Sequence, residues 1–348
     1  MSNVTLSDGE VLLVASRGAE ERHGLWSWSR GDRGWVGKQL ATVTQLSSLA
    51  RHPRLPVVYG TSRVGLEGAI HAWRIEDGRA ATIGDKSSEG AEPCHLAVDP
   101  DGRLLIITNY TTSTLAIQNL AADGSFDGAI ELIKLQGGGP ETDRQDDAHP
   151  HQALFHDGTL FIVDLGADLL REFTLDPNAR GAAALRAGPV TAVPAGSGPR
   201  HGVVLPDGRF ALSGELGSNL LTGLPRSPVD SWADVPSTLR TGQAKTRHLR
   251  NYPGDIQRSR EGRHVYFANR GYDTISTFDV SGQTPRLVNE LDSTVDWPQH
   301  LLVLDDHLLI AGWDSSKVVA MPLVDGVPDA AEPLFACEGA GWLLVFRE

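Results

Sequence analysis

A repeat that runs along the whole chain constrains the fold more than any other feature. In each copy a short apolar run ends in a small or polar pair, passes a turn and continues as an alternating apolar run. Seven copies begin at Val11, Val57, Leu104, Leu160, Phe210, Val265 and Leu308. Equivalent points in these copies are Ser16, Thr61, Asn109, Asp164, Glu215, Asn269 and Gly312, which by subtraction lie 43 to 55 residues apart. A period of roughly 40–50 residues is typical of four-stranded propeller blades.

The local composition of each copy predicts strands. The runs are rich in Val, Ile, Leu, Phe and Tyr and are bounded by Gly, Asp, Asn and Pro. Several turns read Asp-Gly, a pair that tolerates the positive φ of a hairpin. Sustained helical periodicity is missing over any window of about 12 residues. We therefore expect an all-β, seven-bladed β-propeller with four-stranded blades around a central channel, as a single domain over residues 1–348.

Both ends of the chain are expected to close this fold. Residues 339–346 read as one more strand after the seventh copy, and residues 4–6 are apolar enough to pair with it. Such pairing would remove the exposed sheet edges that favour aggregation.

Polar residues recur at the start of the strand that precedes each equivalent point. The positions are His95, His151, Arg200, His201 and His300, with Ile256 at the corresponding place in another copy. In a propeller this strand is the innermost one of its blade, so we expect these side chains to converge. Any one of these histidines is more often structural than catalytic, whereas several charged groups at one place favour a functional site.

Charge and cysteine content exclude several classes of function. The chain has 31 Lys and Arg against 44 Asp and Glu, a net charge of -13, which argues against nucleic-acid binding. No apolar run is long enough for a membrane helix, and no signal peptide is visible. Cys94 and Cys337 make neither a disulfide framework nor a metal motif, which is typical of a cytoplasmic protein.

Four ordered motifs carry a resemblance to a known family. They are PCHLAVDPDG from Pro93, AHPHQALFHDG from Ala148, GPRHGVV from Gly198 and NRGYDTIS from Asn269. Together they resemble the seven-bladed propeller lactonases, which include the propeller type of 6-phosphogluconolactonase and the fungal carboxymuconate cyclase. The resemblance is close from Pro93 to about Phe278 and weaker toward both termini.

The resemblance implies a catalytic set of His151, Arg200, Glu215 and Arg270. His149 competes with His151 for the role of base. Further substrate-binding residues are expected at His95, His201, Asn109, Asp164, Asn269 and His300. The chemistry is sound, because a histidine near its ordinary pKa can activate water and arginines can stabilise an oxyanion or hold an anionic group. Glu215 can orient one of these groups or act as the base itself.

The leading hypothesis is a hydrolase that opens 6-phosphogluconolactone or a related anionic sugar lactone, in the pentose phosphate pathway of carbohydrate metabolism. The alternatives are a carboxymuconate-type lactonizing cycloisomerase and a non-catalytic propeller that binds a ligand or protein. No cofactor and no metal are expected, although Asn109, Asp164 and Asn269 occupy positions where calcium-dependent propellers place ligands. The oligomeric state stays open.

Two segments leave the substrate open. The first two copies depart from the family pattern, at VASRGAEERHG and at Gly60, Thr61 and Ser62, which would line the channel mouth. The basic run KTRHLR at residues 245–250 could bind a substrate phosphate or form a solvated loop.

Overall fold

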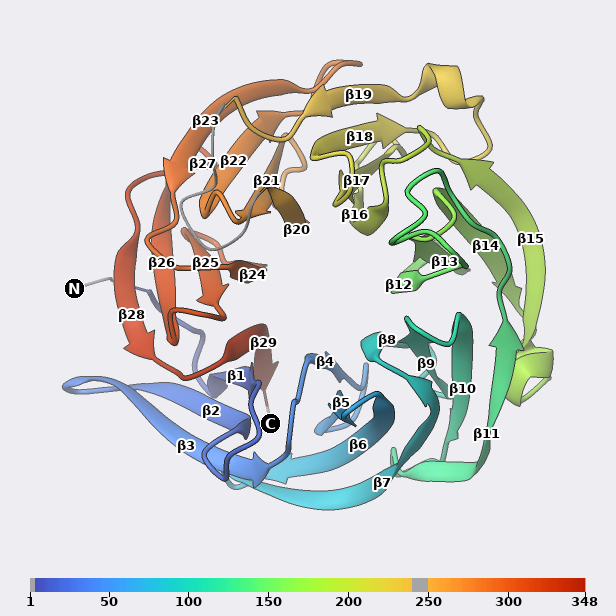
Figure 1. Ribbon diagram of the computed structural model, residues 1–348. Coiled ribbons are helices and arrows are strands. Elements are labelled where there is room, and N and C mark those ends of the chain that lie inside the picture. The colour runs from blue at the N-terminus through green and yellow to red at the C-terminus, as the bar shows by residue number, and fades with distance from the viewer. Residues whose placement is uncertain (1–3, 240–249, 348) are drawn as a thin grey trace. The chain divides into compact units, whose positions relative to one another are not determined.

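The structure is a computed structural model that describes residues 4–239 and 250–347. Its strands form seven sheets of four strands each, with one short extra strand, which confirms the all-β, seven-bladed β-propeller class (Figure 1). By its contacts the chain divides into two compact units. The N-terminal unit is Leu6–Val190 with the last residues from Leu344, and the C-terminal unit is Thr191–Leu343 with the first residues up to Thr5. That the two form a single domain stays a prediction.

The first two blades contain β1 (Glu10–Ser16), β2 (Gly24–Gly31), β3 (Gly34–Thr42), β4 (Ser48–Arg51), β5 (Val57–Val64), β6 (Glu67–Glu76) and β7 (Arg79–Ala91). The third and fourth contain β8 (Pro93–Val98), β9 (Leu104–Asn109), β10 (Thr114–Leu120), β11 (Phe126–Lys134), β12 (Pro150–His156), β13 (Thr159–Asp164), β14 (Leu169–Leu175) and β15 (Leu185–Ala192), with the 3-10 turn η1 (Gly181–Ala184).

The fifth and sixth blades contain β16 (Pro199–Val204), β17 (Phe210–Gly214), β18 (Asn219–Gly223), β19 (Ala233–Pro236), β20 (Tyr252–Arg258), β21 (His264–Arg270), β22 (Thr274–Asp279) and β23 (Arg286–Asp292), with the 3-10 turn η2 (Val229–Ser231). The last strands are β24 (Pro298–Val303), β25 (His307–Gly312), β26 (Lys317–Val324), β27 (Val327–Pro328), β28 (Glu332–Ala336) and β29 (Ala340–Arg347). β27 is a two-residue addition to the blade β24–β25–β26–β28.

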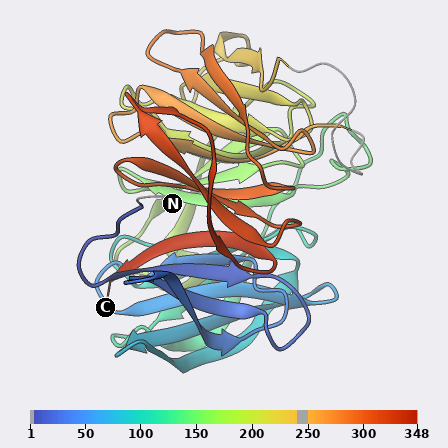
Figure 2. The ribbon, with the colours of Figure 1, turned by 90° about the vertical axis from the view of Figure 1, so that its left-hand side faces the viewer.

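Each predicted repeat copy coincides with the second strand of a blade. The copies match β1, β5, β9, β13, β17, β21 and β25. Since the chain begins on a second strand, the first strand of that blade must come from elsewhere, and β29 supplies it in the order β29–β1–β2–β3. In Figure 2 the red strand β29 runs along the blue strands of this blade. The predicted C-terminal strand is confirmed. The prediction for residues 4–6 is wrong, because they form no strand and β29 already occupies the edge beside β1.

The first strands of neighbouring blades contact one another within each unit. β4 contacts β8 and β8 contacts β12 in the N-terminal unit, and β16 contacts β20 and β20 contacts β24 in the C-terminal unit (Figure 1). The polar positions singled out in the sequence lie on these first strands, as predicted: His95 on β8, His151 on β12, Arg200 and His201 on β16, Ile256 on β20, and His300 on β24.

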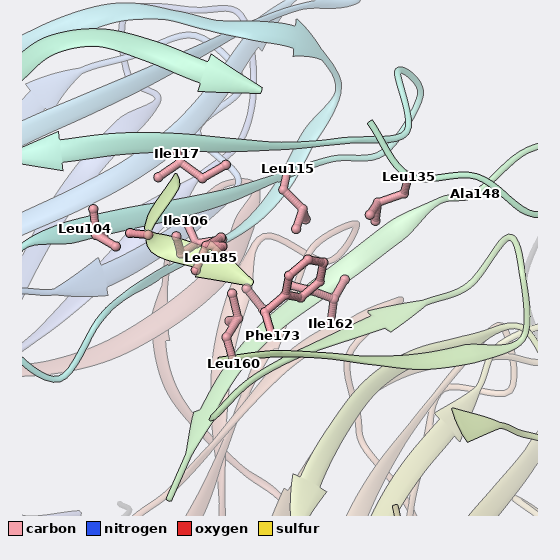
Figure 3. Close-up of a cluster of buried hydrophobic side chains, with 12 residues drawn as sticks. Leu104, Ile106, Leu115, Ile117, Leu135, Ala148, Leu160, Ile162, Phe173 and Leu185 are labelled. Carbon is pink, nitrogen blue, oxygen red and sulfur yellow. The ribbon is translucent and has the colours of Figure 1, made fainter. Parts of the chain in front are cut away.

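Apolar side chains between adjacent blades form the core. One cluster joins the blades β8–β11 and β12–β15, where Ile106 and Ile117 face Leu160, Ile162 and Phe173 (Figure 3). Continuous apolar runs in the second strands produce this packing, since a sheet buried on both faces needs apolar side chains at successive positions. Among the described residues no helix is long and apolar enough to cross a membrane.

Candidate anion-binding and catalytic site

Arg200, Glu215 and Arg270 come together in the C-terminal unit, as the resemblance implied. Arg200 is the second residue of β16, Glu215 directly follows β17, and Arg270 ends β21. The Glu215 Oε2 atom lies 3.2 Å from Arg200 Nε and 2.5 Å from Arg270 Nη2. All three residues are at most 6% exposed. One carboxylate thus bridges two guanidinium groups that come from two different blades.

Bulges at the start of the first strands direct the side chains of this region. The register between β16 and β17 shifts between Pro199 and Gly202, so the bulge contains Arg200 and His201. The β20–β21 register shifts between Pro253 and Ile256. Such bulges re-aim side chains next to functional sites. Here the bulges break the regular alternation of side-chain directions at consecutive polar residues.

The Arg270 side chain is held on several sides. Its Nε donates to the Tyr252 carbonyl at 2.9 Å, and its Nη1 donates to Gln299 Oε1 at 3.3 Å. The guanidinium carbon lies 5.0 Å from the ring centroid of Trp297, a cation–π contact. Gly254 leaves room for the side chain, because a Cβ there would lie 2.9 Å from Arg270 Nε. The Arg270 guanidinium group is therefore held in place before any ligand binds.

Electrostatics make this cluster suited to an anion. The two arginines carry two positive charges and Glu215 carries one negative charge, so the cluster has a formal charge of +1 in a nearly dry setting. Buried charges are costly unless they are paired, and the nearby carboxylate of Asp255 offsets the excess charge of this cluster. The guanidinium N–H groups can still bind a ligand carboxylate, phosphate or developing oxyanion directly.

A second buried group, Asp255 with His201 and His300, adjoins this cluster. His201 Nδ1 donates to Asp255 Oδ1 at 2.8 Å, and Leu301 N–H donates to Asp255 Oδ2 at 2.9 Å. His201 Nε2 accepts from Arg200 Nη1 at 3.5 Å. His300 Nδ1 accepts from Leu343 N–H at 3.2 Å, while its Nε2 faces Asp255 at 3.6 Å. Asp255 therefore sets the tautomer of His201 that can receive Arg200.

The pKa values in this group follow from burial. Burial, and then the charge of Arg200, lower the pKa of His201 to about 4, against the opposing effect of Asp255. Burial also lowers the pKa of His300. Burial alone would raise the pKa of Asp255, but His300, His201 and the Leu301 N–H hold it below its usual range. At neutral pH Asp255 is thus ionised between two neutral imidazoles.

Sequence reasoning missed Asp255, Trp297 and Gln299. The sequence pointed to Ile256 at this position of the repeat, but its neighbour Asp255 lies at the site. The bulge between Pro253 and Ile256 shifts the strand register at this point. The available signal was an acidic residue directly beside the position already singled out on this first strand. Trp297 and Gln299 flank Pro298 at the start of β24, and no motif marked them.

His151 and His149 lie in the N-terminal unit, beside Tyr110. His149 Nδ1 is 2.9 Å from the Tyr110 carbonyl oxygen and His149 Nε2 is 3.1 Å from Asp146 Oδ1. The His149 ring stacks on Tyr110 with centroids 4.3 Å apart. His151 meets the Tyr110 ring edge-on at 5.8 Å. Both ring nitrogens of His149 are therefore engaged by its surroundings, which favours His151 as the base.

The remaining predicted binding residues have partners in their own or an adjacent blade. His95 Nδ1 accepts from Ala153 N–H at 3.5 Å. Asn109 Nδ2 donates to Ser88 O and Thr114 Oγ1, and Asn269 Nδ2 donates to Thr274 Oγ1 and Ser276 Oγ. These two asparagines have no exposed surface, so substrate contact there stays a prediction that their placement does not favour.

Asp164 has an equally structural setting. It has no exposed surface, pairs with Arg171 at 2.7 Å, and accepts from the His149 N–H at 2.8 Å. Burial raises the pKa of Asp164, against the effect of Arg171. Within residues 4–239 and 250–347 no group of three or more His, Cys, Asp or Glu could hold a metal ion. The basic run at residues 245–250 lies outside the described residues except for Arg250, which stacks over Tyr252 at 4.8 Å.

Comparison with known proteins identifies the family. The family model described as lactonase, 7-bladed beta-propeller, matches residues 34–326. A 6-phosphogluconolactonase of Formosa agariphila is 27% identical over 297 residues, which are 81% of this chain and 82% of that protein. A 6-phosphogluconolactonase of Bacillus subtilis is 26% identical over 276 residues, 75% of each chain.

A solved structure shows the same fold. The putative 6-phosphogluconolactonase of Bacteroides fragilis superposes with a TM-score of 0.83 and 21% identity, over 99% of each chain. Since the family model covers well over half of the sequence, the chain belongs to the lactonase family of seven-bladed β-propellers.

Proposed function

We propose that the protein is a lactone hydrolase that opens 6-phosphogluconolactone or a related anionic sugar lactone. The observation that carries this proposal is the buried cluster in which Glu215 bridges the guanidinium groups of Arg200 and Arg270. Its support from relatives is that two proteins named 6-phosphogluconolactonase match three quarters or more of this chain. The cytoplasmic location and the pentose phosphate pathway are predictions that accompany this proposal.

The arginines serve the anionic parts of the reaction. Water attack on the lactone carbonyl produces a tetrahedral intermediate whose oxygen carries negative charge. Fixed guanidinium donors in a water-poor setting stabilise that charge strongly, because they need no reorganisation when it develops. Arg270 is held by Tyr252, Gln299 and Trp297, and Arg200 by Glu215 and His201.

The base is the second part of the proposal. Glu215 Oε2 faces both arginines, so we assign it to positioning them rather than to proton abstraction. His151 is assigned as the general base, because an imidazole can accept a proton from water and the competing His149 has both ring nitrogens engaged. It would return that proton to the ring oxygen that leaves as an alcohol.

The test is a coupled assay with freshly prepared 6-phosphogluconolactone, in which the acid product is oxidised to give NADPH. We expect a rate well above spontaneous opening with purified protein. A rate no higher than the spontaneous one would refute the proposal. Parallel assays with gluconolactone and with carboxymuconate, followed by its ultraviolet absorbance, separate a less selective lactonase from a lactonizing cycloisomerase.

A further inference from the structure

A second arginine pair, Arg17 and Arg63, lies in the N-terminal unit. Arg17 directly follows β1, and Arg63 is the penultimate residue of β5. Arg17 Nε donates to Gln45 Oε1 at 2.7 Å, and Arg63 forms an ion pair with Glu92. Thr111 Oγ1 donates to the other oxygen of Glu92 at 2.5 Å. This set also has two guanidinium groups and one carboxylate among its named members.

The repeat shows that Arg17 and Arg270 occupy the same place in their blades. Arg17 follows the equivalent point Ser16, as Arg270 follows the equivalent point Asn269. Each arginine contacts a residue in the linker that leads to the next blade, Gln45 for Arg17 and Trp297 for Arg270. At two blades, therefore, an arginine after the equivalent point contacts the linker to the next blade.

The linker residues that contact Arg17, Arg63 and Arg270 have strained backbones. Gln45, Glu92 and Trp297 have φ values of 54°, 53° and 58°. The left-handed region is unfavourable for residues other than glycine, and large side chains held there cluster at binding sites. Glu92 directly precedes β8 as Trp297 directly precedes β24. The backbone therefore bears a cost at the residues that hold the arginine side chains.

Backbone hydrogen bonds hold the two arginine-bearing strand ends together. Gln45 N–H donates to the Gly18 carbonyl at 2.8 Å, and Ser47 N–H donates to the Thr61 carbonyl at 2.9 Å. One short linker thus joins the end of β1 to β5. Burial, and then the charge of Arg63, lower the pKa of Arg17 to about 10, so Arg17 remains charged at neutral pH.

The pair is open to a ligand, unlike the cluster around Glu215. The side chains of Arg63 and Glu92 are 29% and 30% exposed, against 6% and 7% for Arg200 and Glu215. Two guanidinium groups from different strands suit an oxyanion with several outward oxygens, and a phosphate monoester carries about −1.5 to −2 charges at pH 7.

We propose that Arg17 and Arg63 form a binding site for a phosphate group. The source of that phosphate is either the substrate, in which case the inference rests on the proposed lactonase function, or free inorganic phosphate. The first two repeat copies depart from the family pattern at this site, so it would set the substrate preference of this chain.

Titration calorimetry tests the site without depending on activity. The probes are 6-phosphogluconate, gluconate and inorganic phosphate, with wild type, Arg17→Gln, Arg63→Gln and the exposed control Arg79→Gln. We expect Arg17→Gln and Arg63→Gln each to weaken 6-phosphogluconate binding about tenfold or more, as the loss of a charged hydrogen bond does. Gluconate binding and the control should not change.

The three probes separate the sources of the phosphate. If the arginine variants lose affinity for 6-phosphogluconate and for inorganic phosphate equally, the site binds the phosphate of the substrate. If they lose affinity for inorganic phosphate alone, the site binds the free anion. Unchanged binding of both in folded variants overturns the site. Melting curves identify misfolded variants, and Arg17→Lys, which keeps the charge without the fork, should weaken binding less than Arg17→Gln.

Kinetics supply the second arm of the experiment. If the substrate carries the phosphate, the same variants should raise KM for 6-phosphogluconolactone about tenfold and leave kcat/KM for gluconolactone unchanged. Equal KM changes for both lactones would overturn a phosphate-specific role. If the wild type opens neither lactone, the proposed function fails while calorimetry still decides whether the site exists.

Discussion

At the scale of single residues, the site depends on arginines whose positions are fixed by neighbours. Arg200 is the clearest case. Its Nη1 donates a hydrogen bond to His201 Nε2, which can accept only while Asp255 keeps the imidazole proton on His201 Nδ1. Motifs in the sequence predicted Arg200, Glu215 and Arg270, because these residues lie in recognisable strand ends. Asp255 and Trp297 escaped prediction, since a bulge and a left-handed linker residue bring them to the site, and neither has a residue pattern of its own.

We predict that Asp255→Asn acts through Arg200. The amide cannot accept from both His201 Nδ1 and Leu301 N–H as the carboxylate does, so His201 loses its fixed tautomer. Lactone kcat/KM should fall about 10- to 100-fold, and the free energy of unfolding by about 1–3 kcal/mol. The exposed control Asp207→Asn should leave kcat/KM unchanged.

The pH profile shows whether Asp255 positions Arg200 or only supports the fold. Removing the carboxylate removes the effect that raises the pKa of His201, so any loss of kcat/KM that follows protonation of His201 should move to lower pH. The acid limb set by the general base should stay at its wild-type position. A variant with lower stability but unchanged kcat/KM and pH profile would assign Asp255 to folding alone.

At the scale of elements, each blade depends on its neighbours for a core. The repeat located every second strand, because two-sided burial imposes continuous apolar runs there. The repeat did not locate the strand at the sheet edge beside β1 equally well. Residues 4–6 are apolar without being a strand, since Val4 is fully buried but the edge beside β1 belongs to β29.

We predict that Ile162→Ala destabilises the packing between the blades β8–β11 and β12–β15. Ile162 is fully buried against Ile106 and Phe173, so the substitution leaves a cavity that costs about 2–5 kcal/mol. Urea unfolding measures the loss. Val190→Ala on β15, where the side chain is 49% exposed, should change stability by less than about 0.5 kcal/mol. Similar effects of both substitutions would contradict this account of the core.

At the scale of the whole molecule, buried neutral histidines make stability depend on pH. Burial is the first cause that lowers the pKa of His201, His300, His52, His71 and His264. A lowered pKa means that the unfolded chain binds a proton before the folded protein does. Stability therefore falls as the pH drops below about 6.5, and the contribution of His201 continues down to about pH 4. Net charge alone could not predict this, because it does not report burial.

We predict that the free energy of unfolding decreases between pH 7 and pH 5. His201 alone should account for about 2 kcal/mol at pH 5, since each unit of pKa difference corresponds to about 1.4 kcal/mol. Urea midpoints at the two pH values measure the change, and His201→Gln should reduce the dependence on pH. Stability that stays constant from pH 7 to pH 5 would show that His201 is not buried as described.

The central claim is that Arg200 and Arg270 bind the anionic part of a lactone substrate or its transition state. Steady-state kinetics of Arg200→Ala, Arg270→Ala and the double variant on 6-phosphogluconolactone test it most directly. Each single variant should lose about 10²–10³-fold in kcat, as removal of one oxyanion donor does, and the double variant should fall to the spontaneous rate. Circular dichroism should show an intact β-sheet. A folded double variant with wild-type kcat/KM would contradict the claim.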